Sequence, residues 1–199
     1  MHATQCTKIK ERNIMSEFWS NLTDESEALD AILTGYKGEV KNMPIYEDVT
    51  KYLVGNHDKS VLDFGCGAGR NIQWLKHNYK TVYGYDFPNM LKLAARETLE
   101  DENVYLSSNL DDICSRDYDV VLFSLVLQHI HPNELRDILK ELCSCSRQFI
   151  IHSRTWVDFT FEPILPILNE FFDHDVLEYK KDPNSELNDH FVGVFFPKE

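Results

Sequence analysis

The most constraining feature of the sequence is a glycine-rich stretch, VLDFGCGAGRN, at residues 61–71. Residues 61–64 are predicted as a buried strand, and the apolar residues of RNIQWLKHNY, at 70–79, recur at helical spacing. Glycines between a strand and a helix allow the backbone to turn tightly and a ligand to approach it closely. The stretch therefore predicts a strand–turn–helix unit of an α/β domain with a ligand site at the turn.

Strand and helix patterns alternate along the rest of the chain. Short β-branched and aromatic runs predict strands at residues 61–64, 81–86, 103–106, 118–125 and 148–153, and helical spacing predicts helices at 70–79, 88–100, 132–143 and 163–172. Residues 175–181 and 190–196 predict a terminal antiparallel pair. This order of elements predicts a doubly wound α/β sheet.

The first 59 residues carry no strand pattern. They show two helical patterns, one between Phe18 and Leu33 and one from Tyr46 to Leu53. The chain has 199 residues, close to the size of one domain. We expect one structural domain, in which residues 1–59 form a helical N-terminal cap over the pocket and residues 60–199 form the ligand-binding α/β unit.

Charge and composition exclude several classes of partner. The chain has 20 Lys and Arg against 33 Asp and Glu, a net charge of -13, and no run of basic residues. Nucleic-acid binders need a basic surface, so we expect no nucleic-acid partner.

The start lacks the apolar stretch of a signal peptide, and no later stretch is apolar enough to span a membrane. The scattered cysteines match no metal or redox spacing, so we expect a cytoplasmic protein without a metal.

A carboxylate at the end of the second predicted strand strengthens the ligand interpretation. Asp86 follows that strand, where an acid can accept both hydroxyls of a ribose. An NAD-dependent oxidoreductase is the main competitor, but dinucleotide folds usually have G-x-G-x-x-G, which brings a helix N-terminus to a pyrophosphate. Here the run is G-x-G-x-G, and Arg70 stands where the last glycine would fall. The pattern favours a nucleoside ligand without a pyrophosphate.

At these residues the chain resembles the class I S-adenosylmethionine-dependent methyltransferases. VLDFGCGAGRN is similar to their first motif, VYGYDFPNMLKLA to their second, SSNLDDI to the segment that holds the adenine, and YDVVLFSLVLQHIHPNEL to the fourth strand and its substrate-facing loop. The resemblance covers residues 60–151 in motif detail. It implies a Rossmann-like seven-stranded sheet whose last strand is antiparallel, S-adenosyl-L-methionine as cofactor, and methyltransferase activity.

The resemblance also assigns the cofactor contacts by position. In the first motif, Asp63, Gly65 and Gly67 would hold the methionine and ribose parts of the cofactor. In the second motif, Asp86 would bind the ribose hydroxyls. The adenine would be flanked by Phe87 and contacted at its edge by the Asn109 side chain and the Leu110 backbone. Many members have Asp where Asn109 stands, but an amide still offers an acceptor. Many also have a Pro-Gly-Gly turn where this chain has residues 143–148.

Candidates for a catalytic base are histidines after the fourth and fifth strands. In-line methyl transfer needs mainly alignment and exclusion of water, and needs a base only where the acceptor must lose a proton. His129 is the first candidate, because it falls in the substrate-facing loop and titrates near neutrality; packing within the loop is its alternative. His131 is predicted as an exposed residue before a helix. His152 either reaches the pocket or has a structural role.

Aromatic residues of the N-terminal region complete the predicted pocket. Trp19, Tyr36 and Tyr46 are candidates for its wall, with simple core packing as the alternative. We expect a small-molecule acceptor, because little chain remains for a macromolecule-docking domain. A protein or RNA methyltransferase with a partner subunit is an alternative that a basic patch near Lys37, Lys41 and Lys51 would favour. A cofactor-binding protein without activity is another. The sequence leaves the oligomeric state open.

Overall fold

The computed structural model describes residues 22, 28, 45, 47–53, 57–98, 100–154, 163–180 and 190–198. Its strands form one seven-stranded sheet with the order β3-β2-β1-β4-β5-β7-β6. The strands are β1 (Ser60–Phe64), β2 (Thr81–Tyr85), β3 (Val104–Ser107), β4 (Val120–Ser124), β5 (Phe149–Arg154), β6 (Phe172–Lys180) and β7 (His190–Pro197).

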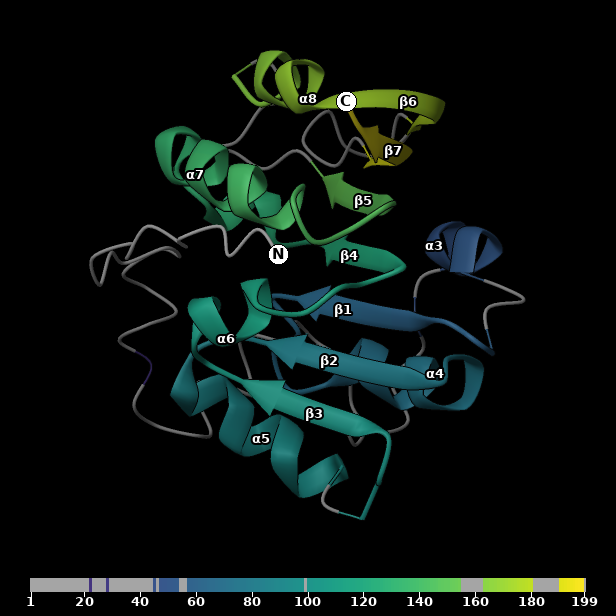
Figure 1. Cartoon of the computed structure of the whole chain (residues 1–199), viewed down its shortest axis with the longest axis vertical. Helices are drawn as coiled ribbons and strands as arrows, with labels where there is room; N and C mark the ends of the chain where they lie inside the picture. The colour runs from purple at the N-terminus through teal and green to yellow at the C-terminus, as the bar shows by residue number, and fades with distance from the viewer. Residues whose placement is uncertain are drawn as a thin grey trace, which may run out of the picture.

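The connections between the strands are mostly helical (Figure 1). The helices are α3 (Glu47–Leu53), α4 (Arg70–Asn78), α5 (Pro88–Thr98), α6 (Leu110–Cys114), α7 (Pro132–Leu142) and α8 (Leu165–Phe171), with a 3₁₀ turn η2 (Leu127–His129). Every strand predicted from the sequence is present. The helical pattern that ends at Leu53 is confirmed as α3, whereas α6 and η2 were not predicted.

The pairing of the strands confirms the predicted fold class. β1 is parallel to β2 and β4, β2 is parallel to β3, and β4 is parallel to β5. β7 is antiparallel to both of its neighbours, β5 and β6. Because β1 to β5 point the same way, the segments that follow them meet at one edge of the sheet (Figure 1). The chain is a doubly wound, Rossmann-like α/β sheet with a reversed last strand.

Apolar side chains cover both faces of this sheet. On one face, the rings of Phe64 and Phe123 stack at a centroid distance of 4.9 Å, and helix α7 covers them with Leu135, Ile138, Leu139 and Leu142. These α7 residues are spaced i, i+3, i+4 and i+7, which places them on one side of the helix. On the other face, α3 and α4 pack against residues of β1, β4 and β5. Burial on both faces explains the nearly continuous apolar runs of the central strands.

The N-terminal region contributes two described residues to the wall of the glycine turn. Leu22 and Ala28 are buried and pack with Ala68, Met90 and Leu93. The amide of Asn89, in α5, donates a hydrogen bond of 2.6 Å to the carbonyl oxygen of Leu22. That residues 1–59 form a helical cap stays a prediction, because most of them lie outside the described residues. Within the described part of the chain, no helix is long and apolar enough to cross a membrane.

Candidate cofactor and acceptor site

The glycine turn after β1 has the backbone conformation that the sequence predicted. Gly65, Gly67 and Gly69 have φ angles of 77°, 57° and 86°, all in the left-handed region that glycine adopts without strain. The N–H groups of Gly65 and Cys66 donate to the carbonyl oxygen of Tyr85 at 2.8 and 3.0 Å. The turn is thereby fastened to the end of β2, where the predicted ribose-binding acid follows.

Asp63 and Asn71 form a buried polar pair beneath the turn. Nδ2 of Asn71 donates to Oδ1 of Asp63 at 3.2 Å, and both side chains are almost completely buried. The other oxygens, Oδ2 of Asp63 and Oδ1 of Asn71, are buried and accept no hydrogen bond from the described residues. Burial raises the pKa of Asp63 to about 7, against the lowering effects of Asn71 and Arg70. The pair therefore offers two acceptors suited to a cationic donor. Asn71 was not assigned from the sequence, although it ends the first motif.

Asp86 connects the two halves of the predicted nucleoside site. Its Oδ2 accepts from the N–H of Gly67 and its Oδ1 from the N–H of Phe87, both at 2.7 Å. Burial raises the pKa of Asp86 to about 6, against the lowering effect of these two N–H donors. Each carboxylate oxygen has a further lone pair, so the orientation of the group is fixed while acceptor capacity remains for ligand hydroxyls.

The predicted adenine segment forms the short helix α6. Oδ1 of Asn109 accepts from the N–H of Asp111 at 2.9 Å and so caps the helix. The Asn109 amide oxygen, which was predicted to contact the adenine, therefore accepts a hydrogen bond from the protein's own backbone. The NH₂ group of the same amide is left to contact a ligand. Leu110 is buried in the apolar core, and Phe87 is half-buried against the same core.

His129 lies in η2, after β4, in surroundings that change its titration. Burial, together with the positive charge of Arg154, lowers the pKa of His129 to about 4. This corrects the expectation that His129 titrates near neutrality. Just before η2, Leu125 has a φ of 59°, a strained value for a residue with a side chain. Its N–H donates to the carbonyl oxygen of His152 at 2.7 Å, which holds the loop against β5.

The two other histidines have different surroundings. His131 is exposed and caps α7, since its Nδ1 accepts from the N–H of Asn133 at 3.3 Å, as predicted. His152 is completely buried, with Nδ1 3.5 Å from Oγ of Ser124 and Nε2 3.4 Å from Nδ1 of His190. His190 was not a candidate from the sequence. No local pattern marks it, because only the pairing of β7 with β5 brings it to this edge.

Comparison with known proteins shows what the glycine turn and the central strands are similar to. Residues 62–148 match the family model described as a methyltransferase domain. Over these residues, which make up less than half of its length, the chain is similar to that family. A similar relative, an uncharacterized methyltransferase of Geobacillus sp. (strain WCH70), is 30% identical over 87 residues, which span 43% of this chain and 41% of that protein.

Solved methyltransferase structures share the fold at low sequence identity. A TehB-like S-adenosylmethionine-dependent methyltransferase from Corynebacterium glutamicum has a TM-score of 0.68 and 15% identity, covering 88% of this chain and 100% of its own. Magnesium protoporphyrin IX methyltransferase from Synechocystis PCC 6803, with bound S-adenosylmethionine, has a TM-score of 0.59 and 19% identity, and the match covers 88% of this chain and 98% of that enzyme. The N-methyltransferase NodS from Bradyrhizobium japonicum WM9, in complex with S-adenosylhomocysteine, has a TM-score of 0.61 and 14% identity, and the match covers 88% of this chain and 86% of NodS.

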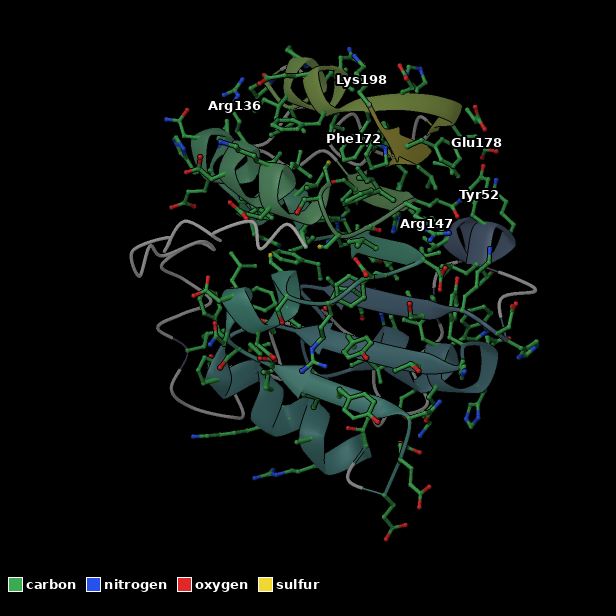
Figure 2. The ribbon with its side chains drawn as sticks, in the orientation of Figure 1. Tyr52, Arg136, Arg147, Phe172, Glu178 and Lys198 are labelled. Atoms are coloured by element: carbon green, nitrogen blue, oxygen red, sulfur yellow. The ribbon has the colours of Figure 1, made fainter. Side chains whose placement is uncertain are left out.

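Other residues predicted for the site lie away from the glycine turn or outside the described residues. Trp19, Tyr36 and Tyr46 are outside the described residues, so their place in a pocket stays a prediction. Lys51, on α3, forms a 2.6 Å ion pair with Glu178 of β6, and the Tyr52 hydroxyl donates to the same carboxylate (Figure 2). Among the residues that the structure describes, no three His, Cys, Asp or Glu side chains are placed to hold a metal ion.

Proposed function

We propose that this chain binds S-adenosyl-L-methionine at the glycine turn and transfers its methyl group to a small-molecule acceptor. The observation that carries the proposal is the pair of buried acceptors, Oδ2 of Asp63 and Oδ1 of Asn71, beside the turn. The methionine part of the cofactor has an ammonium group, a donor-only cation that would satisfy both oxygens. Its positive charge would also favour the ionised form of Asp63, which burial alone disfavours.

The remaining cofactor contacts follow from the positions already described. Asp86, held by Gly67 and Phe87, would accept hydrogen bonds from the ribose hydroxyls. The Phe87 ring would flank the adenine, and the Asn109 amide and the Leu110 backbone would contact its edge. Because these residues follow β1, β2 and β3, the cofactor would lie along the carboxyl edge of the sheet, the usual ligand side of a doubly wound fold.

When bound, S-adenosylmethionine supplies an electrophilic methyl group on a sulfonium with a good leaving group. What the chain must add is alignment of the acceptor and exclusion of water. His129, on the loop after β4, is the candidate base. Its pKa of about 4 leaves it neutral at physiological pH, so the ring need not lose a proton before it acts as a base, though its basicity is weak. This suits an acceptor that needs little help in losing its proton.

A small-molecule acceptor is supported by the charge of the chain. The net charge is -13, and Lys51, part of the basic patch that would favour a macromolecular substrate, is neutralised by Glu178. The names of two neighbours, an N-methyltransferase and magnesium protoporphyrin IX methyltransferase, describe those proteins and set a precedent for this fold.

Titration calorimetry tests the cofactor site directly. We expect S-adenosylmethionine and S-adenosylhomocysteine to bind, and Asn71→Leu to weaken both by removing one of the two acceptors. Asn169→Leu, a change of the same size at an exposed position of α8, is the matched control. Binding of NAD without binding of either methyltransferase ligand would refute the proposal.

A further inference from the structure

Gln128 lies in the turn η2, in the loop that follows β4. In the sheet, β2 and β3 lie on one side of β1, whereas β4 and β5 lie on the other, so the strand order reverses between β1 and β4. Ligands of open α/β sheets bind in the crevice outside the carboxyl ends of the strands at such a reversal. The glycine turn follows β1 and the loop of Gln128 follows β4, so the two segments lie on either side of this crevice (Figure 1).

A buried serine holds the side chain of Gln128. Oγ of Ser153, in β5, lies 2.9 Å from Oε1 of Gln128, and Ser153 is completely buried. The preceding residue, His152, accepts a backbone hydrogen bond from Leu125 in the same loop. The loop is therefore fastened to two successive residues of β5, once through its backbone and once through the carboxamide of Gln128.

The hydroxyl of Ser153 decides which way the carboxamide is turned. Within the described part of the chain, Gln128 is the only hydrogen-bond partner of this hydroxyl. If the carboxamide were reversed, its NH₂ would donate to Oγ, and the hydroxyl proton would be buried without an acceptor. A buried donor without a partner carries a full desolvation penalty. The hydroxyl therefore donates to Oε1, and the NH₂ group points away from Ser153.

The NH₂ group of Gln128 is left with two donors for a ligand. Among the residues that the structure describes, Nε2 has no hydrogen-bond partner, and it is not one of the buried atoms that lack a partner. Gln128 itself is half-buried. A carboxamide nitrogen only donates, and it carries no charge. Such a group pairs with an oxygen that has lone pairs and does not pair with an ammonium group.

We propose that the NH₂ group of Gln128 binds a carbonyl or carboxylate oxygen of the methyl-accepting substrate and thereby selects acceptors that carry such an oxygen. The inference rests on the proposed function and deepens it, since it names a chemical feature of the acceptor. Ser153 is a positioning residue, because it acts on the substrate only by orienting Gln128. His129 is the next residue of the same turn, so an acceptor held by Gln128 lies beside the candidate base.

The test uses small probes on the full chain saturated with S-adenosylhomocysteine. Acetophenone offers a carbonyl and benzoate a carboxylate, whereas α-methylstyrene has the shape of acetophenone but no oxygen. Nitrogen-15 NMR follows the side-chain NH₂ group of Gln128. We expect acetophenone or benzoate to bind saturably and to shift this signal, and α-methylstyrene to bind about tenfold more weakly than acetophenone. The tighter of the two oxygen probes identifies the carbonyl or the carboxylate as the preferred group.

Isosteric variants separate the donor from the shape of the loop. Gln128→Glu keeps the size of the side chain and replaces the NH₂ group by an oxygen, so it should weaken acetophenone about tenfold. Gln148→Glu is the matched control, because Gln148 directly precedes β5 at the opposite edge of the sheet, and it should bind acetophenone normally. Gln128→Leu also removes the donor without adding charge, and should show the same loss if Gln128→Glu does not fold.

The role of Ser153 has its own readout. In Ser153→Ala the NH₂ signal of Gln128 should move toward that of a freely rotating side chain, and Ser153→Thr, which keeps the hydroxyl, should restore it. An unchanged signal in a folded Ser153→Ala protein overturns the positioning role.

Three results overturn the recognition of the oxygen by Gln128. They are equal binding of acetophenone and α-methylstyrene, no saturable shift with either oxygen probe, and unchanged affinity for acetophenone in the Gln128 variants. The titrations are repeated without S-adenosylhomocysteine, so Gln128 is tested whether or not that ligand binds. Failure of S-adenosylhomocysteine to bind contradicts the proposed function, whereas its binding without recognition of either oxygen probe contradicts only the role of Gln128.

Discussion

Asp86 accepts a hydrogen bond of 2.7 Å from the backbone N–H of Gly67, 19 residues earlier in the chain. The bond joins the turn after β1 to the end of β2, so the two halves of the proposed nucleoside site hold one another in place. A carboxylate that the protein itself has oriented loses less conformational freedom when a ligand binds.

Replacing this carboxylate should therefore weaken cofactor binding strongly. Hydrogen bonds to charged groups contribute roughly 1.5–3 kcal/mol, so we expect Asp86→Ala to reduce the affinity for S-adenosylhomocysteine by about ten- to a hundredfold. Titration calorimetry measures the change. Glu170→Ala, which removes a carboxylate from an exposed ion pair with Arg136, is the control and should bind normally. Unchanged affinity in a folded Asp86→Ala protein would show that Asp86 does not contact the ribose.

The raised pKa of Asp63 predicts how stability depends on pH. Folded Asp63 has a pKa of about 7, whereas the unfolded chain has the ordinary value of 3.8, so the folded state binds a proton that the unfolded state has released. The free energy of unfolding of the ligand-free protein therefore falls as pH rises from about 4 through 7. Asp86, with a pKa of about 6, acts in the same direction at lower pH.

Urea denaturation between pH 6.5 and 8 isolates the effect of Asp63. His129, with a folded pKa of about 4, has the opposite sign, but its contribution levels off as pH rises above its unfolded pKa of 6.5. Asp63→Asn removes the titrating group and should flatten the decline with pH. Equal pH slopes in the variant and the wild type would mean that Asp63 is not the group responsible.

For His129, the expected pH profile of activity is flat near neutrality. Because its pKa is about 4, a base at this position remains unprotonated from pH 6 to pH 8. His129→Ala should lower turnover by about 10²–10⁴-fold if it accepts the proton, with cofactor affinity nearly intact. The measurement needs an acceptor found by screening phenols, amines, carboxylates and thiols for methylated product. The control is His131→Ala, at the exposed cap of α7, which should have wild-type turnover. Wild-type turnover in His129→Ala would show that His129 only packs within its loop.

Gly84, in the middle of β2, should not tolerate a side chain. An added Cβ would lie 2.7 Å from Cδ2 of Leu106, 2.8 Å from Cδ1 of Ile72 and 3.1 Å from Sγ of Cys66. We expect Gly84→Ala to lower the free energy of unfolding by about 1–3 kcal/mol through overpacking. In a double-mutant cycle with Leu106→Ala, the two changes should cost less together than the sum of each alone. If the two losses of stability simply add, the added methyl group does not press on Leu106, which would mean that strand β2 has moved to make room for it.

The fold could be predicted from the sequence because its signals are local and repeated. The glycine turn at 65–69 and the alternating runs each specify an element without reference to distant residues, and all predicted strands are present. The helix α6 and the turn η2 were missed because five and three residues are too few to show helical periodicity. Asn109 followed by Asp111 and Asp112 is a helix N-terminal pattern that could have indicated α6.

The site was predictable only where its chemistry lies within one motif. The positive φ angles of the turn and the position of Asp86 follow from the spacing around β1 and β2. The pKa of His129 and the place of His190 depend on residues that approach through the sheet: Arg154 lies 25 residues after His129 in sequence, and His190 lies 38 residues after His152. Burial and register across strands are not visible in a linear pattern.

The hydrogen bond from Asn89 to the Leu22 carbonyl has a kinetic consequence. Asn89 is in α5, the helix that begins directly after Asp86 and Phe87, and Leu22 is buried against the same helix. A movement of α5 that widens the proposed nucleoside site must also break the contacts of Leu22, about forty residues before the glycine turn. We therefore expect the dissociation rate of S-adenosylhomocysteine from the proposed site to depend on Leu22 as well as on the residues that bind the ligand.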